Sequence, residues 1–269
     1  MILRKHQPFY KRPPILFAAG LLVVALAVLG GVMLLSGNSG GTDDVSTVVK
    51  EKTPTQSESG TAGGPDAIST MTPTSAAIAL EELPANYEVD IPNTFAMTVS
   101  TFSSSYWFKS DTEGQDLAKQ WRIIDGYQVY YQPKGLAAEA LTGAAYVRVE
   151  LYKFVDPEGA GQAWGHLQGL MHRTTGSEAV EANPLANDWA AYRVLEGTVG
   201  TSDTLAVFHR YNFRRGNYVV SVQTWGADPH MNIDPARNIA ATIDDKLLGA
   251  RPAVEPTPIP TPSFPGLGN

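Results

Sequence analysis

The sequence contains no cysteine, which excludes disulfide bonds, thiol catalysis and zinc sites built on cysteine. It is also short of positive charge, with 20 Lys and Arg against 27 Asp and Glu, for a net charge of −7. An acidic chain is not expected to bind the phosphate backbone, so nucleic acid is an unexpected partner. Without disulfide bonds or zinc–cysteine sites, any folded part must be held together by its packed core alone.

Residues 15–35 lack charged side chains. As a helix they would span roughly 31 Å, close to the ~30 Å hydrocarbon core of a bilayer. Arg4, Lys5, Lys11 and Arg12 precede this stretch, whereas the first charges after it are acidic. Because basic flanks stay in the cytoplasm, we expect a single-pass signal anchor in the lipid bilayer of the cell membrane, with residues 1–14 cytoplasmic and the C-terminal part extracytoplasmic.

A cleaved signal peptide is the alternative to this anchor. The small residues Ala25 and Ala27 flank Leu26, and this spacing is typical of a cleavage site after a basic region. Apolar residues continue for eight positions beyond Ala27, however, and no polar cleavage region follows. The lengths favour an uncleaved anchor, and cleavage near Ala27 stays open.

Two low-complexity stretches follow the anchor. Residues 36–83 are rich in Ser, Thr, Gly, Pro and Ala, and residues 250–269 contain six prolines. Such compositions bury too little apolar surface to order themselves, so we expect a disordered linker and a disordered Pro-rich tail. The remaining residues, 84–249, have the length of one extracytoplasmic domain.

Apolar periodicity within 84–249 predicts both helices and strands. Asp156-Pro157 and Asp234-Pro235 each read as the start of a helix with an apolar stripe, and a weaker helix is expected at 115–121. Strands are expected at 94–101, 127–132, 144–154, 189–196, 205–214 and 217–225. The predicted fold is α+β: an antiparallel sheet of about five to six strands packed with two or three helices, preceded by one transmembrane helix.

Three segments carry a family resemblance. They are the helix start DPEGAGQAW, the hairpin RRGNYVVSVQTWG and the closing amphipathic helix. In this order they resemble uncharacterised membrane-anchored extracytoplasmic domains of bacteria, with the α/β/α sandwich of the PsbP and LpqN type. The resemblance implies a fold and carries no functional residue across.

The sequence contains no catalytic motif that would define an enzyme. Gly159, Gly161 and Gly165 superficially resemble a dinucleotide-binding loop, but Trp164 stands where a close-packing glycine is needed, so no cofactor is expected. The histidine spacings match no metal site, and we expect no metal. Carboxylates on or beside strands, at Glu150, Asp188 and Glu196, leave an exported hydrolase of cell-envelope material as the alternative function.

The predicted hairpin suggests a binding surface. With Arg215-Gly216 as the turn, Arg210 pairs with Ser221 and Phe208 with Gln223, which places Arg210, Ser221, Gln223 and Trp225 on one face. Arg beside aromatic residues, with few long aliphatic ones, is the composition of recognition surfaces. We therefore expect a binding or accessory module that meets an envelope protein or a small ligand at this face. The alternative is a face that is solvated or covered by the third helix.

Overall fold

A computed structural model of the protein describes residues 67–84, 86–134, 144–186, 188–198 and 203–254. The predicted anchor at 15–35 lies outside these ranges, as do most of the predicted linker and tail. Within them, no helix has both the length and the apolar character needed to cross a membrane.

The described residues form one antiparallel sheet of eight strands in an α+β fold. Its strands are β1 (Tyr87–Val89), β2 (Phe95–Met97), β3 (Ile123–Pro133), β4 (Tyr146–Phe154), β5 (Ser177–Ala179), β6 (Asp188–Thr198), β7 (Leu205–Arg215) and β8 (Tyr218–Ala227). They follow the order β1-β3-β4-β8-β7-β6-β5, and β2 also pairs with β3. The predicted five to six strands were too few, because β1 and β5 have only three residues each, which is too short for a periodicity signal.

Helices precede, interrupt and follow the strands. They are α2 (Pro73–Ala76), η2 (Leu80–Glu82), η3 (Ile91–Asn93), α3 (Val99–Ser103), α4 (Asp111–Gln120), α5 (Pro157–Arg173) and α6 (Asp234–Leu247). The predicted α5 start is confirmed, since the Asp156 carboxylate accepts a hydrogen bond from the Gly159 N–H. The predicted strand at 94–101 was wrong beyond Met97, because the Thr98 hydroxyl caps α3 by accepting from the Thr101 N–H.

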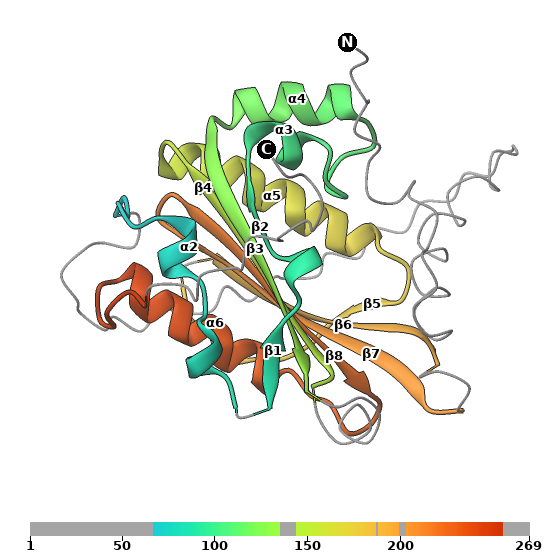
Figure 1. Cartoon of the computed structure of the whole chain (residues 1–269). Coiled ribbons are helices and arrows are strands. Elements are labelled where there is room, and N and C mark those ends of the chain that lie inside the picture. Colours follow the sequence, from blue (N-terminus) through green and yellow to red (C-terminus); the bar gives the residue numbers. More distant parts are fainter. Residues whose placement is uncertain (1–66, 85, 135–143, 187, 199–202, 255–269) are drawn as a thin grey trace, which may run out of the picture.

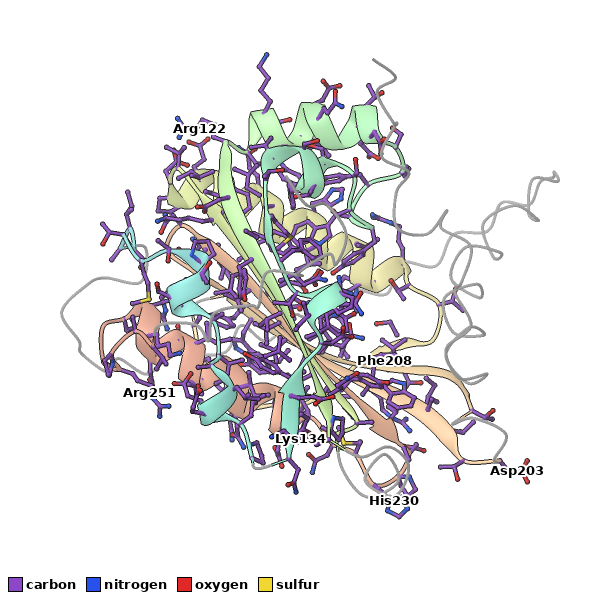
Figure 2. All side chains as sticks on the ribbon, in the orientation of Figure 1. Arg122, Lys134, Asp203, Phe208, His230 and Arg251 are labelled. Carbon is purple, nitrogen blue, oxygen red and sulfur yellow. The ribbon has the colours of Figure 1, made fainter. Side chains whose placement is uncertain are left out.

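The helices cover both faces of the sheet (Figure 1). Helices α2 and α6 pack on one face, where Ala240 and Ile243 belong to the same cluster as Phe213 and Val220. Helices α3, α4 and α5 lie on the other face, in the cluster that contains Tyr152. Side chains fill the space between the layers (Figure 2). The result is a three-layer α/β/α arrangement.

The hairpin of β7 and β8 differs from its predicted register by two residues. Arg215 pairs with Tyr218, so the turn is Gly216-Asn217 rather than Arg215-Gly216. Gly216 has φ of +51°, and a Cβ there would lie 2.0 Å from the Ala67 carbonyl oxygen. Asn217 is buried, and its amide donates to the Phe154 carbonyl and accepts from the Ser69 N–H. These contacts with distant segments fix the turn, and local turn chemistry could not reveal them.

Residues 67–84, which we call the strap, belong to the folded domain. Ala76 and Ile78 are buried in the core cluster under α6. The predicted linker boundary at residue 83 was therefore wrong. Composition alone missed it because small apolar residues gain burial from the rest of the domain, although they could not form a core among themselves.

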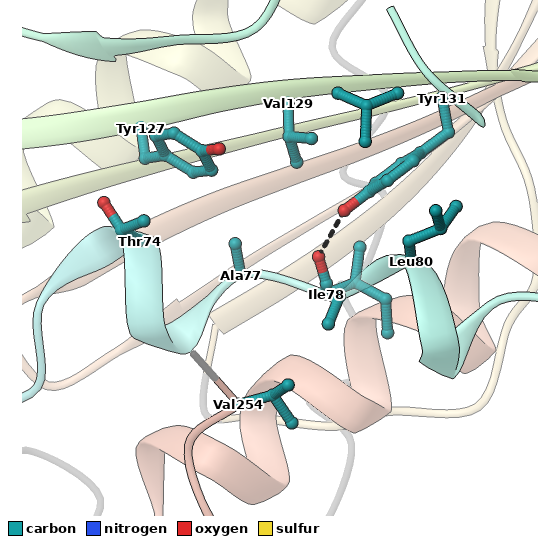
Figure 3. A pocket seen from close by; sticks show the side chains of 10 residues that line it. Thr74, Ala77, Ile78, Leu80, Tyr127, Val129, Tyr131 and Val254 are labelled. Carbon is teal, nitrogen blue, oxygen red and sulfur yellow. Dashed lines mark hydrogen bonds between the residues drawn. The ribbon is translucent and has the colours of Figure 1, made fainter. Parts of the chain in front are cut away.

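Side-chain donors hold the backbone carbonyls of the strap. Lys153 Nζ donates to the Met71 carbonyl over 2.7 Å, and the Tyr218 hydroxyl donates to the same oxygen. Tyr131 donates to the Ile78 carbonyl over 2.6 Å (Figure 3). The fully buried Lys246 donates to the Ala77 carbonyl over 2.7 Å and pairs with Glu82 over 2.6 Å. The strap is therefore fixed by strands and by α6, although it adds no strand.

A small cavity of about 20 Å³ lies between the strap and β3 (Figure 3). It is lined mainly by apolar side chains, including Ile78, Val129 and Val254. The volume suits about one water molecule. Val254 also shows that the chain after α6 stays against the domain for a few residues past the predicted boundary at residue 250.

Candidate functional site

The sheet face opposite α6 carries a graded set of side chains, which we call the graded face. Cross-strand pairing of β4 with β8 and of β8 with β7 arranges its side chains in rows. From the end under α5 outward, these rows are apolar (Tyr152, Val219), polar (Glu150, Ser221, Asn212), charged (Arg148, Gln223, Arg210) and aromatic (Tyr146, Trp225, Phe208). One face thus passes from packed core to a mixed polar and aromatic surface.

The polar row is buried but not fully hydrogen-bonded. Glu150, Ser221 and Asn212 are exposed by only 2%, 1% and 0%. The Ser221 hydroxyl and both atoms of the Asn212 amide have no hydrogen-bond partner. A buried polar group without a partner costs about 1–3 kcal/mol, so such groups are rare where only stability matters.

Glu150 is the one acidic side chain of these rows, and it is held from two sides. Arg148 forms an ion pair with it, and the Tyr106 hydroxyl donates to its Oε2 over 3.0 Å. Arg148 also donates to Gln128 Oε1 over 3.1 Å. Burial is the largest single influence on the pKa of Arg148 and lowers it, but the Glu150 carboxylate and three neighbouring tyrosines together raise it by more. The pKa of the guanidinium is therefore raised, and Arg148 is charged at neutral pH.

Arg210 differs from Arg148 because no carboxylate neutralises it among the described residues. Its guanidinium donates to Gln223 Oε1, to the Tyr106 hydroxyl over 3.2 Å and to the Met171 sulfur over 3.5 Å. All three acceptors are neutral. Charge-assisted bonds to an anion are roughly twice as strong as neutral ones. Arg210 is thus a half-buried cation that keeps the capacity to bind an anion.

Tyr106 lies over the charged row. It comes from the loop between α3 and α4, and its ring centroid is 5.1 Å from the Arg148 guanidinium carbon and 5.5 Å from that of Arg210. The side chain is 41% exposed, while its hydroxyl faces inward toward Glu150. Burial of this hydroxyl raises the pKa of Tyr106, so the phenol is neutral at pH 7.

The aromatic row extends the face beyond the charges. Trp225 lies 5.6 Å from Tyr146 and 6.1 Å from Phe208, measured between ring centroids. All three side chains are half-buried, and the Trp225 Nε1 has no hydrogen-bond partner. Flat aromatic area of this kind is well suited to contact a ligand or partner.

The structure brings the four predicted residues together. Arg210, Ser221, Gln223 and Trp225 share the graded face, but Arg210 pairs with Gln223 instead of Ser221, and Phe208 pairs with Trp225 instead of Gln223. Ser221 was expected at the surface and is buried. The third predicted helix, α4, belongs to the aromatic cluster around Trp121, and α5 reaches Arg210 through Met171.

Sequence reasoning missed three partners of Arg210 and Glu150. Met171 lies on the predicted helix α5, and the packing of α5 on the sheet brings its sulfur to Arg210. Arg148 lies two residues from Glu150 on β4, and the strand order β4-β8-β7 places it across Gln223 from Arg210. Tyr106 lies in a short loop without periodicity, so no sequence signal placed it.

The carboxylates considered for hydrolysis do not converge among the described side chains. Glu150 is engaged by Arg148 and Tyr106, and Asp188 pairs with Arg214 over 2.5 Å. Their strands, β4 and β6, are three strand spacings apart, roughly 14 Å at ~4.8 Å per strand. Catalytic pairs in glycosidases are about 5–10 Å apart. This geometry does not favour the hydrolase alternative.

Gly159 and His166, considered for cofactor and metal sites, make structural contacts. A Cβ on Gly159 would lie 2.0 Å from the Trp121 carbonyl oxygen, so this glycine allows α5 to pack closely. His166 Nε2 contacts the Trp107 carbonyl over 2.8 Å. His209 is buried, and its Nδ1 lacks a partner. In the described ranges, no three His, Asp or Glu side chains are grouped so that they could hold a metal ion.

Comparison with known proteins identifies no family for this chain. No protein-family model matches the sequence, and no curated protein matches it. Among solved structures, the extracellular domain of PknH from Mycobacterium tuberculosis is similar, with 14% sequence identity and a TM-score of 0.35. The match covers 64% of this chain and 92% of that domain.

Proposed function

We propose that this protein is a membrane-anchored extracytoplasmic binding or accessory module that recognises its ligand or partner with the graded face. The predicted anchor at 15–35 and its basic N-terminal flank support the location. Arg210 carries the binding proposal, because its charge has only neutral acceptors while Arg148 is paired with Glu150.

The charge balance of the face defines what it would bind. Arg148, Glu150 and Arg210 together carry a formal charge of +1, in a chain whose net charge is −7. An anionic group on the ligand would give Arg210 charge-assisted bonds and would neutralise the row. Trp225 and Phe208 lie in the next row and would offer flat apolar area beside that anion.

The test uses the full chain in its native membrane. Partners are recovered by cross-linking and mass spectrometry, and their retention is compared between the wild type and the variant Arg210→Ala, Trp225→Ala. The variant should lose several kcal/mol of binding, as hot-spot residues do, because it removes both the cation and the flat apolar area.

A matched variant separates loss of binding from loss of folding. Arg193→Ala changes a half-buried arginine of β6 that already pairs with Asp228, and it should leave retention unchanged. Equal retention by the wild type and by a folded Arg210→Ala, Trp225→Ala variant would exclude the graded face as the binding site.

A further inference from the structure

Tyr106 occupies the charged row in the manner of a bound ligand. It does not belong to the sheet, yet its ring lies against two guanidinium groups. Its hydroxyl donates to Glu150 and accepts from Arg210. The side chain therefore uses the aromatic face, the donor and the acceptor that a phenol offers to a binding site.

The loop that carries Tyr106 allows its side chain to leave without unfolding the domain. Trp107 and Phe108, the next two residues, are anchored in the aromatic cluster around Phe102. The Tyr106 side chain is 41% exposed, so it borders on solvent on one side. Rotation about χ1 would break the two hydrogen bonds of the hydroxyl, but it can move this ring without moving the anchored backbone.

Departure of the ring would leave a polar site rather than an apolar gap. Glu150 would lose the bond from the Tyr106 hydroxyl, and Arg210 would lose one of its neutral acceptors. Ser221 and Asn212, in the same row as Glu150, already have polar atoms without partners. The exposed floor would thus offer two cations, one carboxylate and unused hydrogen-bond groups to whatever replaced the phenol.

We infer that Tyr106 is a removable plug, and that the ligand which displaces it carries a planar hydroxylated ring joined to an anionic group. The planar ring takes the place of the Tyr106 ring against the guanidiniums of Arg148 and Arg210, which stack on aromatic faces. Its hydroxyl replaces the phenol bond to Glu150. The anionic group neutralises Arg210, which the phenol of Tyr106 cannot do. This inference rests on the proposed function, because it assigns a ligand class to the same face.

Chemical complementation of the full chain tests the plug. The variant Tyr106→Ala vacates the ring position, and 4-hydroxyphenylacetate is the probe, since it combines a phenol with a carboxylate. Calorimetry should show at least tenfold tighter binding to the variant than to the wild type, because the wild type must first displace Tyr106. The probe should also raise the melting temperature of the variant more than that of the wild type.

Matched probes resolve the ligand class. p-Cresol keeps the phenol without the carboxylate, and cyclohexylacetate keeps the carboxylate without the aromatic ring; both should bind the variant more weakly than 4-hydroxyphenylacetate. Glucuronate tests a non-aromatic hydroxylated acid. Tighter binding of glucuronate or of cyclohexylacetate than of 4-hydroxyphenylacetate would overturn the aromatic class.

A second variant keeps the test decisive if Tyr106→Ala does not fold. Tyr106→Phe retains the ring but removes the bonds to Glu150 and Arg210, so it should bind 4-hydroxyphenylacetate more tightly than the wild type does.

Equal affinity of the wild type and of every folded Tyr106 variant would overturn the plug. If the membrane partner still required Arg210 and Trp225 in that case, the proposed function would stand without the plug. Loss of 4-hydroxyphenylacetate binding in the double variant Tyr106→Ala, Arg210→Gln would show that the probe and the membrane partner use the same cation, Arg210.

Discussion

The two faces of the sheet use the same strands for different purposes. The face under α6 and the strap is filled mainly by apolar side chains such as Phe213 and Val220, with two buried polar groups, Thr224 and His209, among them. The graded face begins as core under α5 and then carries a row of buried polar groups, an arginine paired with Glu150 and, among the described residues, a second arginine that has only neutral acceptors. The first face maximises burial. The second gives up some stability, and sites that bind ligands commonly show this cost.

Among the changes that test this contrast between the faces, removal of the strap should have the largest effect on stability. A chain that starts at residue 84 should be several kcal/mol less stable than one that starts at residue 67, because Ile78 leaves the core and the buried Lys246 loses both of its acceptors. Urea denaturation of residues 67–254 and 84–254 measures the difference. Equal urea denaturation midpoints would mean that the strap adds no stability and belongs to the linker.

Two phenylalanines of β7 compare the faces directly. Phe213 is fully buried toward α6, and Phe213→Ala should cost about 3–5 kcal/mol of unfolding free energy. Phe208 is half-buried in the aromatic row, and Phe208→Ala should cost only about 1–2 kcal/mol. Denaturant melts of both variants are the measurement. Similar costs would mean that the graded face is as much a core as the other.

Two unpaired hydroxyls of β8 separate stability from function. Ser221 lies on the graded face and Thr224 on the α6 face, and neither hydroxyl has a partner. Ser221→Ala and Thr224→Val should each leave stability unchanged or raise it by up to about 1 kcal/mol, since each removes an unsatisfied buried group. Only Ser221→Ala should weaken retention of the membrane partner. Loss of retention in Thr224→Val as well would remove the functional distinction between the faces.

The smallest expected effect is a pH dependence at His209, on the α6 face. Burial, followed by the nearby Arg193 cation, lowers the pKa of His209, although Asp228 opposes this. The unfolded chain therefore binds a proton more readily than the folded one, and stability should fall as pH drops below about 6.5, by no more than about 1.4 kcal/mol per pH unit. Thermal melts between pH 5 and 8 should show a shallower dependence in His209→Gln. An identical dependence would assign it to other groups.

Sequence patterns predicted the α+β class and the long elements because these depend on periodicity within a segment. The apolar stripe of α5 and the alternation along β7 are local, and each survives whatever the segment packs against. Face membership was also predictable. The register error at the hairpin was two residues, and a shift by an even number leaves every side chain on its own face.

The tertiary structure decided which residues became neighbours. The strand order set Arg148 and Arg210 on either side of Gln223, and contacts of Asn217 with Phe154 and Ser69 fixed the turn. The strap gained order from burial against the rest of the domain and from donors on distant elements, such as Lys246. Tyr106 came to lie over Glu150 through a loop without a repeating pattern. The sequence by itself determined what each segment forms and which face each residue joins, whereas the partners of a side chain depend on long-range packing that no local pattern encodes.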